Sequence, residues 1–287
     1  MLGRVTSHPP ALADADLDAL ERLVRASRRI VALTGAGVST ESGIPDYRDD
    51  TGAWKRRPPI DYKDFVSRDA ARRRYWARSR VGWPSFAAAT PNAAHHALAR
   101  LERAGRIHHV VTQNVDGLHQ RAGSEGVIDL HGRLDTVECL ACRATEPRDA
   151  YQTRLSDANP AAESAPPEPA PDGDADLEPD SLDRFVVPDC RLCGGVVKPS
   201  VVFFGEVVPA SRVRDAYARV EEADLLLVAG TSLEIFSGRR FVLAAAERAV
   251  PIAIVNRGAT RADALASVRV GGSVGLALDG LARRLDG

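Results

Sequence analysis

Lysine is nearly absent from this sequence, because only Lys55, Lys63 and Lys198 occur among 38 basic residues. We interpret this as an arginine bias of the source and not as a functional signal. The net charge is −1 and the pI is about 6.7, so no strong field would draw the chain to nucleic acid or to acidic lipid. No apolar run reaches the roughly 20 residues that a membrane-spanning helix requires, and residues 1–14 lack the apolar core of a secretory signal. These absences predict a soluble cytoplasmic protein with neither nucleic acid nor a membrane as partner.

Cysteine is also scarce, and the four cysteines form two Cys-x-x-Cys pairs, Cys139 with Cys142 and Cys190 with Cys193. In a reducing compartment this arrangement favours a metal site over disulfides. A redox role of a single Cys-x-x-Cys is disfavoured because there are two pairs. Four thiolates make a closed tetrahedral site with no open position for catalysis. We therefore predict one structural zinc ion per chain.

Short apolar runs that predict buried strands alternate with amphipathic helical patterns. Such an alternation predicts an α/β fold, a Rossmann-like doubly wound parallel sheet with helices on both faces. A small zinc-binding and helical domain is expected beside it. The predicted strands span residues 30–33, 109–112, 127–130, 225–229 and 252–255, and the clearest helices span 16–26, 91–104 and 238–249.

The predicted domain boundaries follow from these patterns and from composition. We expect a flexible tail at 1–15, a Rossmann-like domain built from 16–50, 87–137 and 198–287, a helical part of the small domain at 51–86, and a zinc module at 138–197. Within that module, residues 156–183 are rich in Pro, Ala and acids and contain neither Lys nor Arg. This composition buries little apolar surface and predicts a disordered loop.

A glycine turn, Gly35-Ala36-Gly37, follows the first predicted strand. Glycines at such a turn let the backbone approach a pyrophosphate closely. Thr40 stands where a dinucleotide fingerprint has its third glycine, so an ordinary strand-to-helix turn fits this segment equally well. The continuation through Ile44, Asp46, Tyr47 and Arg48 is more specific, because a stable core does not require that grouping.

Two further polar motifs follow predicted strands, where ligands of open α/β sheets bind. Gln113, Asn114 and Asp116 could hydrogen-bond ribose hydroxyls and a carboxamide, or could form a polar loop with a helix cap. His131 stands beside Gly132 at a strand end, which suits a general base near neutral pH. A structural histidine remains the alternative there, and it is the preferred interpretation for the other histidines.

Three weaker segments complete the set, and each alone would pass for an ordinary turn or core strand. The segment 198–206 predicts a strand whose edge could pair with an extended peptide. The others are strand ends with hydroxyl or amide side chains. The residues are Val202, Phe204, Gly205 and Glu206 in the first segment, Gly230, Thr231 and Ser232 in the second, and Asn256 in the third.

Taken together and in this order, the motifs resemble those of the sirtuins, NAD-dependent protein-lysine deacylases, over roughly residues 26–285. The resemblance implies that NAD⁺ lies between the two domains. It assigns a ribose contact to Gln113, and it places Tyr47 and Arg48 in the loop over the nicotinamide pocket. The residues matched to adenosine and phosphate contacts are Gly35, Ala36, Gly37, Gly230, Thr231, Ser232 and Asn256. Those matched to the nicotinamide pocket are Ile44, Asp46, Asn114 and Asp116. Val202, Phe204, Gly205 and Glu206 match the edge that holds the substrate.

The resemblance also implies a reaction without a protein nucleophile. The acyl-lysine oxygen attacks C1′ of the nicotinamide ribose, and His131 then deprotonates a ribose hydroxyl. The products are free lysine, nicotinamide and 2′-O-acyl-ADP-ribose. His131, Asn114 and Asp116 would be the catalytic residues, and their main task is alignment and exclusion of water.

The segment Arg74-Tyr75-Trp76-Ala77-Arg78, which is followed by Gly82-Trp83-Pro84, is similar to that of mitochondrial-type class II sirtuins. Members of that class can remove acidic acyl groups. Tyr75 and Arg78 are three residues apart, hence on one face of a helix. Our hypothesis is that this pair binds an acidic acyl chain, although Arg78 could equally be a packing or surface residue.

Three other functions compete with deacylation as explanations of these motifs. Mono-ADP-ribosyl transfer to protein uses the same cleavage of NAD⁺ and is barely separated by the motifs. A non-catalytic NAD or ADP-ribose sensor would not need His131. A zinc-ribbon nucleic-acid module is disfavoured by the near-zero charge. The sequence predicts acylated proteins or peptides as partners and leaves the acyl group and the oligomeric state open.

Overall fold

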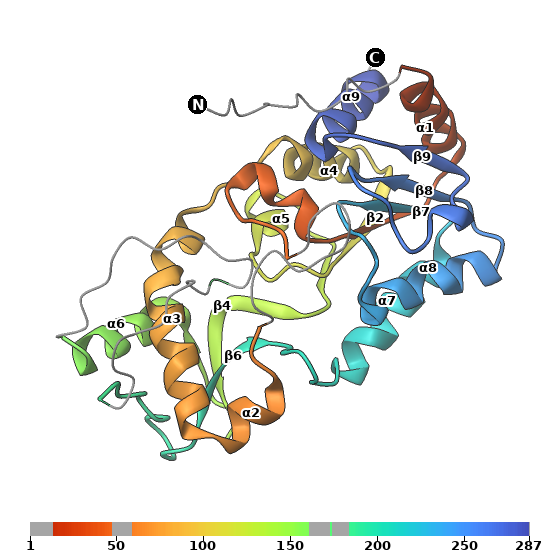
Figure 1. Ribbon diagram of the computed structural model, residues 1–287. Helices are drawn as coiled ribbons and strands as arrows, with labels where there is room; N and C mark the ends of the chain where they lie inside the picture. The colour runs from red at the N-terminus through yellow and green to blue at the C-terminus, as the bar shows by residue number, and fades with distance from the viewer. Residues whose placement is uncertain (1–13, 48–58, 161–172, 174–183, 287) are drawn as a thin grey trace, which may run out of the picture.

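The computed structural model describes residues 14–47, 59–160, 173 and 184–286, and in them a parallel sheet of six strands forms the larger layer (Figure 1). The strand order is β3-β2-β1-β7-β8-β9, which confirms the predicted doubly wound sheet. β9 falls where the sequence predicts no strand. The strands are β1 (Ile30–Thr34), β2 (Ile107–Thr112), β3 (Val127–Asp129), β7 (Leu225–Ala229), β8 (Ile252–Val255) and β9 (Val268–Val270).

Helices cover both faces of this large sheet. Ile30 and Ala32 of β1 pack into one buried cluster, and Val31 and Leu33 pack into another on the opposite face. Each residue of β1 is buried because successive side chains point to opposite faces and both faces are covered. The first cluster includes α1 (Asp14–Ala26), α4 (Ala93–Arg103) and α9 (Val274–Asp286), and the second includes α7 (Ala210–Glu222) and α8 (Phe236–Glu247).

A small antiparallel sheet, ordered β5-β4-β6, forms the second layer of the molecule. Its aromatic-rich core contains Phe65, Trp76 and Tyr151 from three helices. Figure 1 shows these helices grouped around β4 and β6, away from the large sheet. The elements are β4 (Gly132–Cys139), β5 (Thr145–Pro147), β6 (Val197–Val201), α2 (Tyr62–Ser67), α3 (Asp69–Ala88) and α6 (Arg148–Ala158).

The boundaries in this region differ from those expected from sequence. The expected divisions at 137/138 and 197/198 fall inside β4 and β6, because both strands run on toward the large sheet. Helix α6 continues to Ala158, so residues 156–158 of the expected loop are helical, while 161–172 and 174–183 lie outside the described residues. Likewise α1 begins at Asp14, two residues before the predicted start.

The helices were also compared with the length and hydropathy that a membrane span requires. The longest, α3, has 20 residues but carries five arginines. In the described part of the chain, no helix is both long and apolar enough to cross a membrane.

Candidate active site between the two sheets

A cavity of about 1020 Å³ lies where the carboxyl ends of the large-sheet strands face the small sheet. Parallel strands end at the same edge, so motifs that are distant in sequence meet there. With the exception of Arg48, Arg78 and the cysteines, every residue that the sequence predicts for the site lines this cavity. They are Gly35, Ala36, Gly37, Ile44, Asp46, Tyr47, Tyr75, Gln113, Asn114, Asp116, His131, Val202, Phe204, Gly205, Glu206, Gly230, Thr231, Ser232 and Asn256.

The glycine turn after β1 is locked against the end of β7. A Cβ on Gly37 would lie 2.9 Å from the Gly230 carbonyl oxygen, so only glycine permits this approach. The amide of Gly37 donates to that carbonyl at 2.8 Å, and the amide of Gly35 donates to Ala229 at 3.2 Å. Two short 3₁₀ turns follow, Ala36–Val38 and Thr40–Ser42, instead of a long helix. The turn therefore forms a tight floor of the cavity between the ends of β1 and β7.

His131 lies in the two-residue turn between β3 and β4, and its ring is fixed at both nitrogens. Nδ1 lies 2.9 Å from the carbonyl oxygen of Gln113, and Nε2 lies 2.8 Å from Oγ of Ser237. A carbonyl only accepts, so Nδ1 carries the proton of the neutral ring and the lone pair is on Nε2. Burial lowers the pKa of His131 below its usual 6.5, although the bond to the Gln113 carbonyl opposes this shift. The imidazole is thereby held as a neutral base.

Asn114 and Asp116 are joined by the hydroxyl of Ser39. This hydroxyl donates to Asp116 Oδ2 at 2.7 Å and lies 3.0 Å from Nδ2 of Asn114. The other Asp116 oxygen accepts from the Leu118 amide at 2.9 Å. Burial raises the pKa of Asp116 above its usual 3.8, and these hydrogen bonds oppose the shift. The amide and the carboxyl group are thus held rigidly toward the cavity before any ligand binds.

The edge predicted to hold substrate is a turn and not a continuous strand. β6 ends at Val201, and Phe204 makes an isolated bridge to Asp61. The carboxylate of Glu206 accepts from the Phe203 amide at 2.8 Å and from Lys198 Nζ at 3.2 Å. Lys198 is only 1% exposed. One buried ion pair therefore fixes the shape of this edge.

The sequence did not single out Ser39, Ser237, Arg240 or the buried Lys198 for any role. Ser39 could have been found, because it follows the glycine turn by two positions. Ser237 and Arg240 lie in the first two turns of α8, and both line the cavity. Nothing in their sequence neighbourhood distinguishes them from surface residues of a helix.

Of the two α3 residues proposed to bind an acidic acyl chain, Tyr75 and Arg78, the structure places only Tyr75 in the cavity lining. Tyr75 lines the cavity and packs against Phe203 at a ring separation of 5.2 Å. Arg78, three residues later, is not among the described residues that line the cavity, and it has an interaction of its own. Arg48 lies outside the described residues. The acidic-acyl role of Arg78 stays a prediction.

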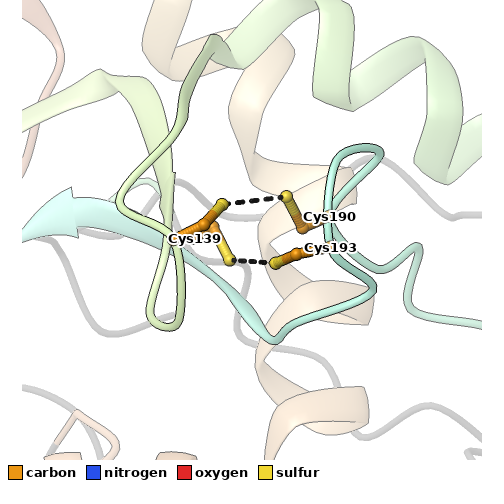
Figure 2. A group of neighbouring side chains, drawn as sticks. Cys139, Cys190 and Cys193 are labelled. Atoms are coloured by element: carbon orange, nitrogen blue, oxygen red, sulfur yellow. Dashed lines mark hydrogen bonds between the residues drawn. The ribbon is translucent and has the colours of Figure 1, made fainter.

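The four cysteines converge on one point of the small domain, between the loop after β4 and the loop before β6 (Figure 2). Their sulfur atoms lie within 4.8 Å of one another, with Cys139 and Cys193 at 3.5 Å and Cys142 and Cys190 at 3.7 Å. Zinc–sulfur bonds of about 2.3 Å in a tetrahedron place the sulfur atoms roughly 3.8 Å apart. A Cβ on Gly195 would lie 2.9 Å from the sulfur of Cys139. The cluster fits one zinc ion.

The family of the chain is indicated by comparison with known proteins. The model of the Sir2 family matches residues 35–237. An NAD-dependent protein deacetylase of Bordetella bronchiseptica is 56% identical over 256 residues, which cover 89% of this chain and 93% of that protein. NAD-dependent protein deacetylase 1 of Streptomyces coelicolor is 52% identical over 256 residues, which cover 89% and 86%.

Solved structures that resemble this chain are also Sir2 proteins. A Sir2 enzyme structure matches with a TM-score of 0.76 at 30% identity, covering 95% of this chain and all of that one. A complex of Sir2 with a p53 peptide and NAD⁺ matches with a TM-score of 0.74 at 31% identity, covering 94% and 96%.

Proposed function

The chain belongs to the Sir2 family, and we propose that it is an NAD-dependent protein-lysine deacylase whose general base is His131. It removes an acyl group from a lysine side chain and releases nicotinamide and 2′-O-acyl-ADP-ribose. The observation that carries this proposal is the orientation of the imidazole. Its Nδ1 proton is held by the Gln113 carbonyl, so the basic Nε2 stands at the cavity wall beside Ser237.

The dinucleotide supplies the bond to nicotinamide that is broken and the sugar that receives the acyl group. We assign its phosphates to the glycine turn and to Thr231 and Ser232, because these segments line the cavity floor. Gln113 reaches Thr231 Oγ1 at 3.1 Å, so the predicted ribose contact is held between the ends of β2 and β7. Gly230 and Asn256 extend this lining to the end of β8.

Asn114 and Asp116 are assigned to the carboxamide of nicotinamide. The Asn114 amide donates to the Gly35 carbonyl at 3.1 Å, which fixes its orientation before binding. Ile44 contributes an apolar wall, and Tyr47 stands edge-on to Phe204 with ring centroids 6.1 Å apart. Such prior alignment of groups reduces the entropy that binding and reaction must overcome.

The acyl-lysine is assigned to the edge formed by Val202, Phe204 and Gly205, with Glu206 holding that edge from behind. The four-cysteine cluster includes Cys139, the last residue of β4, whereas His131 precedes the first residue of that strand, and the cluster would hold a structural zinc ion. Its need for reduced thiols supports the cytoplasm as the compartment. The class II subgroup stays a prediction, supported by the segment around Tyr75.

The test is mass spectrometry of acyl-lysine peptides incubated with the protein, with and without NAD⁺. We expect release of lysine, nicotinamide and one acyl-ADP-ribose per turnover only when NAD⁺ is present. His131→Ala should lower the rate of lysine release at least 1000-fold, at the strong end of what general-base removal costs, while NAD⁺ still binds. His96→Ala is the matched control, because His96 is exposed and does not line the cavity.

Two outcomes would contradict this assignment. Deacylation that proceeds equally without NAD⁺ would remove the dinucleotide from the reaction. A stable mass increase of the acceptor by one ADP-ribose, without loss of its acyl group, would make the protein an ADP-ribosyltransferase.

A further inference from the structure

Almost all of the described charged side chains that line the cavity have a partner within the fold. Glu41 accepts from the Ser273 hydroxyl at 2.6 Å, and Glu234 pairs with Arg261 at 2.8 Å. Glu206 is bound by Lys198, and Asp116 is bound by Ser39. Asp46 and Arg257 also have partners. Each of these side chains therefore already has an interaction partner inside the fold.

Arg240 is the exception among the described charged residues of the cavity. Its Nε is buried and has no hydrogen-bond partner. Its guanidinium group instead lies over the ring of Phe236, 5.1 Å from the centroid. Contact with an aromatic face holds the cation in place and leaves its N–H groups available to an acceptor. A cation without an acceptor at a cavity wall indicates a ligand with negative charge.

The position of Arg240 shows which part of the cavity such a ligand would occupy. Arg240 follows Ser237 by three residues on α8, so both lie on one face of the helix. Ser237 touches His131, which places Arg240 at the reacting end of the cavity. Phe236 also lines the cavity and is 55% exposed, so the guanidinium group lies near the rim. The phosphate-binding turn is on the floor between β1 and β7.

We propose that Arg240 is a specificity residue that binds a carboxylate carried by the acyl-lysine substrate. The inference rests on the proposed deacylase function. The carboxylate belongs either to the end of the acyl chain or to an acidic residue beside the modified lysine. Both are the same chemistry, a bidentate acceptor for the planar guanidinium group, and Arg78 is not required for it.

Two matched pairs of peptides separate these sources. The first pair carries succinyl-lysine or its succinamyl analogue, which differ only by a carboxylate in place of a carboxamide. The second pair carries acetyl-lysine with Glu or Gln as the next residue. For the wild-type protein we expect kcat/KM to be about 10-fold to 100-fold higher for the charged member of one pair, as for a charge-assisted hydrogen bond.

The ratio of kcat/KM for the charged peptide to kcat/KM for its neutral partner should fall close to one in Arg240→Met. Arg240→Lys should retain part of this preference. The loss should appear mainly as a higher KM for the charged peptide, whereas KM for its neutral partner should change much less. Arg239→Met is the matched control, because Arg239 is adjacent, lies 6.0 Å from the same ring and does not line the cavity. It should keep the full ratio. Arg78→Met tests the rival assignment in the same assay.

Three results would overturn the inference while leaving the deacylase function intact. These are ratios near one for both pairs in the wild-type protein, an unchanged ratio in Arg240→Met, or loss of the ratio only in Arg78→Met. A rise in KM for NAD⁺ that is equal for all four peptides would assign Arg240 to the dinucleotide instead. If no peptide is deacylated at all, the proposed function fails first and the inference fails with it.

Discussion

Replacement of Lys198 by methionine tests whether one ion pair fixes the substrate edge. The side chain is almost fully buried, and its Nζ contacts Glu206 and the carbonyl oxygens of Pro199 and Val201. Burial lowers the pKa of Lys198, and the carboxylate of Glu206 opposes this shift. Methionine retains most of the volume but removes the Nζ donor from these acceptors, so the change isolates the loss of the Lys198 charge and its hydrogen bonds.

The expected cost follows from the exposure of the two partners. Removal of one member of a buried ion pair costs about 3–5 kcal/mol. The Lys198 side chain is 2% exposed, but that of Glu206 is 20% exposed and can be partly hydrated. We therefore expect a loss near the lower end, about 3 kcal/mol in the free energy of unfolding. Lys198→Met with Glu206→Gln should recover about 1 kcal/mol or more, because no unpaired charge then remains.

The assays are urea denaturation and steady-state kinetics. Besides the stability loss, we expect a higher KM for the acyl peptide and an unchanged KM for NAD⁺, since we assign the peptide, and not the dinucleotide, to the edge from Val202 to Gly205. Lys63→Met is the control, because Lys63 is exposed, and it should change stability by less than about 0.5 kcal/mol. Equal effects of the two lysine substitutions, or an unchanged KM for the peptide in Lys198→Met, would refute the reasoning.

Two further predictions concern the metal and the pH. Elemental analysis should give about one zinc per chain, and a chelator should lower the melting temperature without changing the pH dependence of kcat; a protein equally stable without zinc would contradict this. Burial lowers the pKa of His119 to about 4 from its usual 6.5, so the unfolded chain binds the proton first as the pH falls. Stability should therefore decrease from pH 6.5 toward pH 4, by roughly 2 kcal/mol at pH 5 from this residue. His119→Gln should flatten that slope in urea titrations and His96→Gln should not, and equal slopes in all three proteins would exclude this cause.

The sequence predicted five of the six strands of the large sheet, all except β9, and the motifs at their ends, because both depend on local patterns. β7 and β8 have the predicted bounds, and His131 and Gln113 meet at a cavity because parallel strands end at one edge. The partners of these residues could not be predicted. Ser237 reaches His131 from a helix 106 positions away, and that contact depends on how α8 packs.

The small domain was predicted less completely for the same reason. The cysteine pairs were recognisable from their spacing, and the structure brings all four together. The ends of β4 and β6 could not be recognised from the sequence, because each strand runs past the expected domain boundary toward the cavity. Burial of Lys198 also has no local signal, since part of its environment is the ring of Tyr62, which α2 brings within 6.0 Å of Nζ.

The route of the chain between the two sheets determines how the cavity can change its width. β3 passes through His131 into β4, and β6 passes into Val202, whose amide donates to the His131 carbonyl at 2.8 Å. A Cβ on Gly132 would collide with the Ser200 carbonyl oxygen, so the two crossings are in tight contact. Any rotation of the small sheet about these crossings has its axis beside the imidazole. Displacement grows with distance from an axis, so the far end of β4 at Cys139 would move most, while Nε2 of His131 and the nearby residues Val202 and Phe203 would stay aligned.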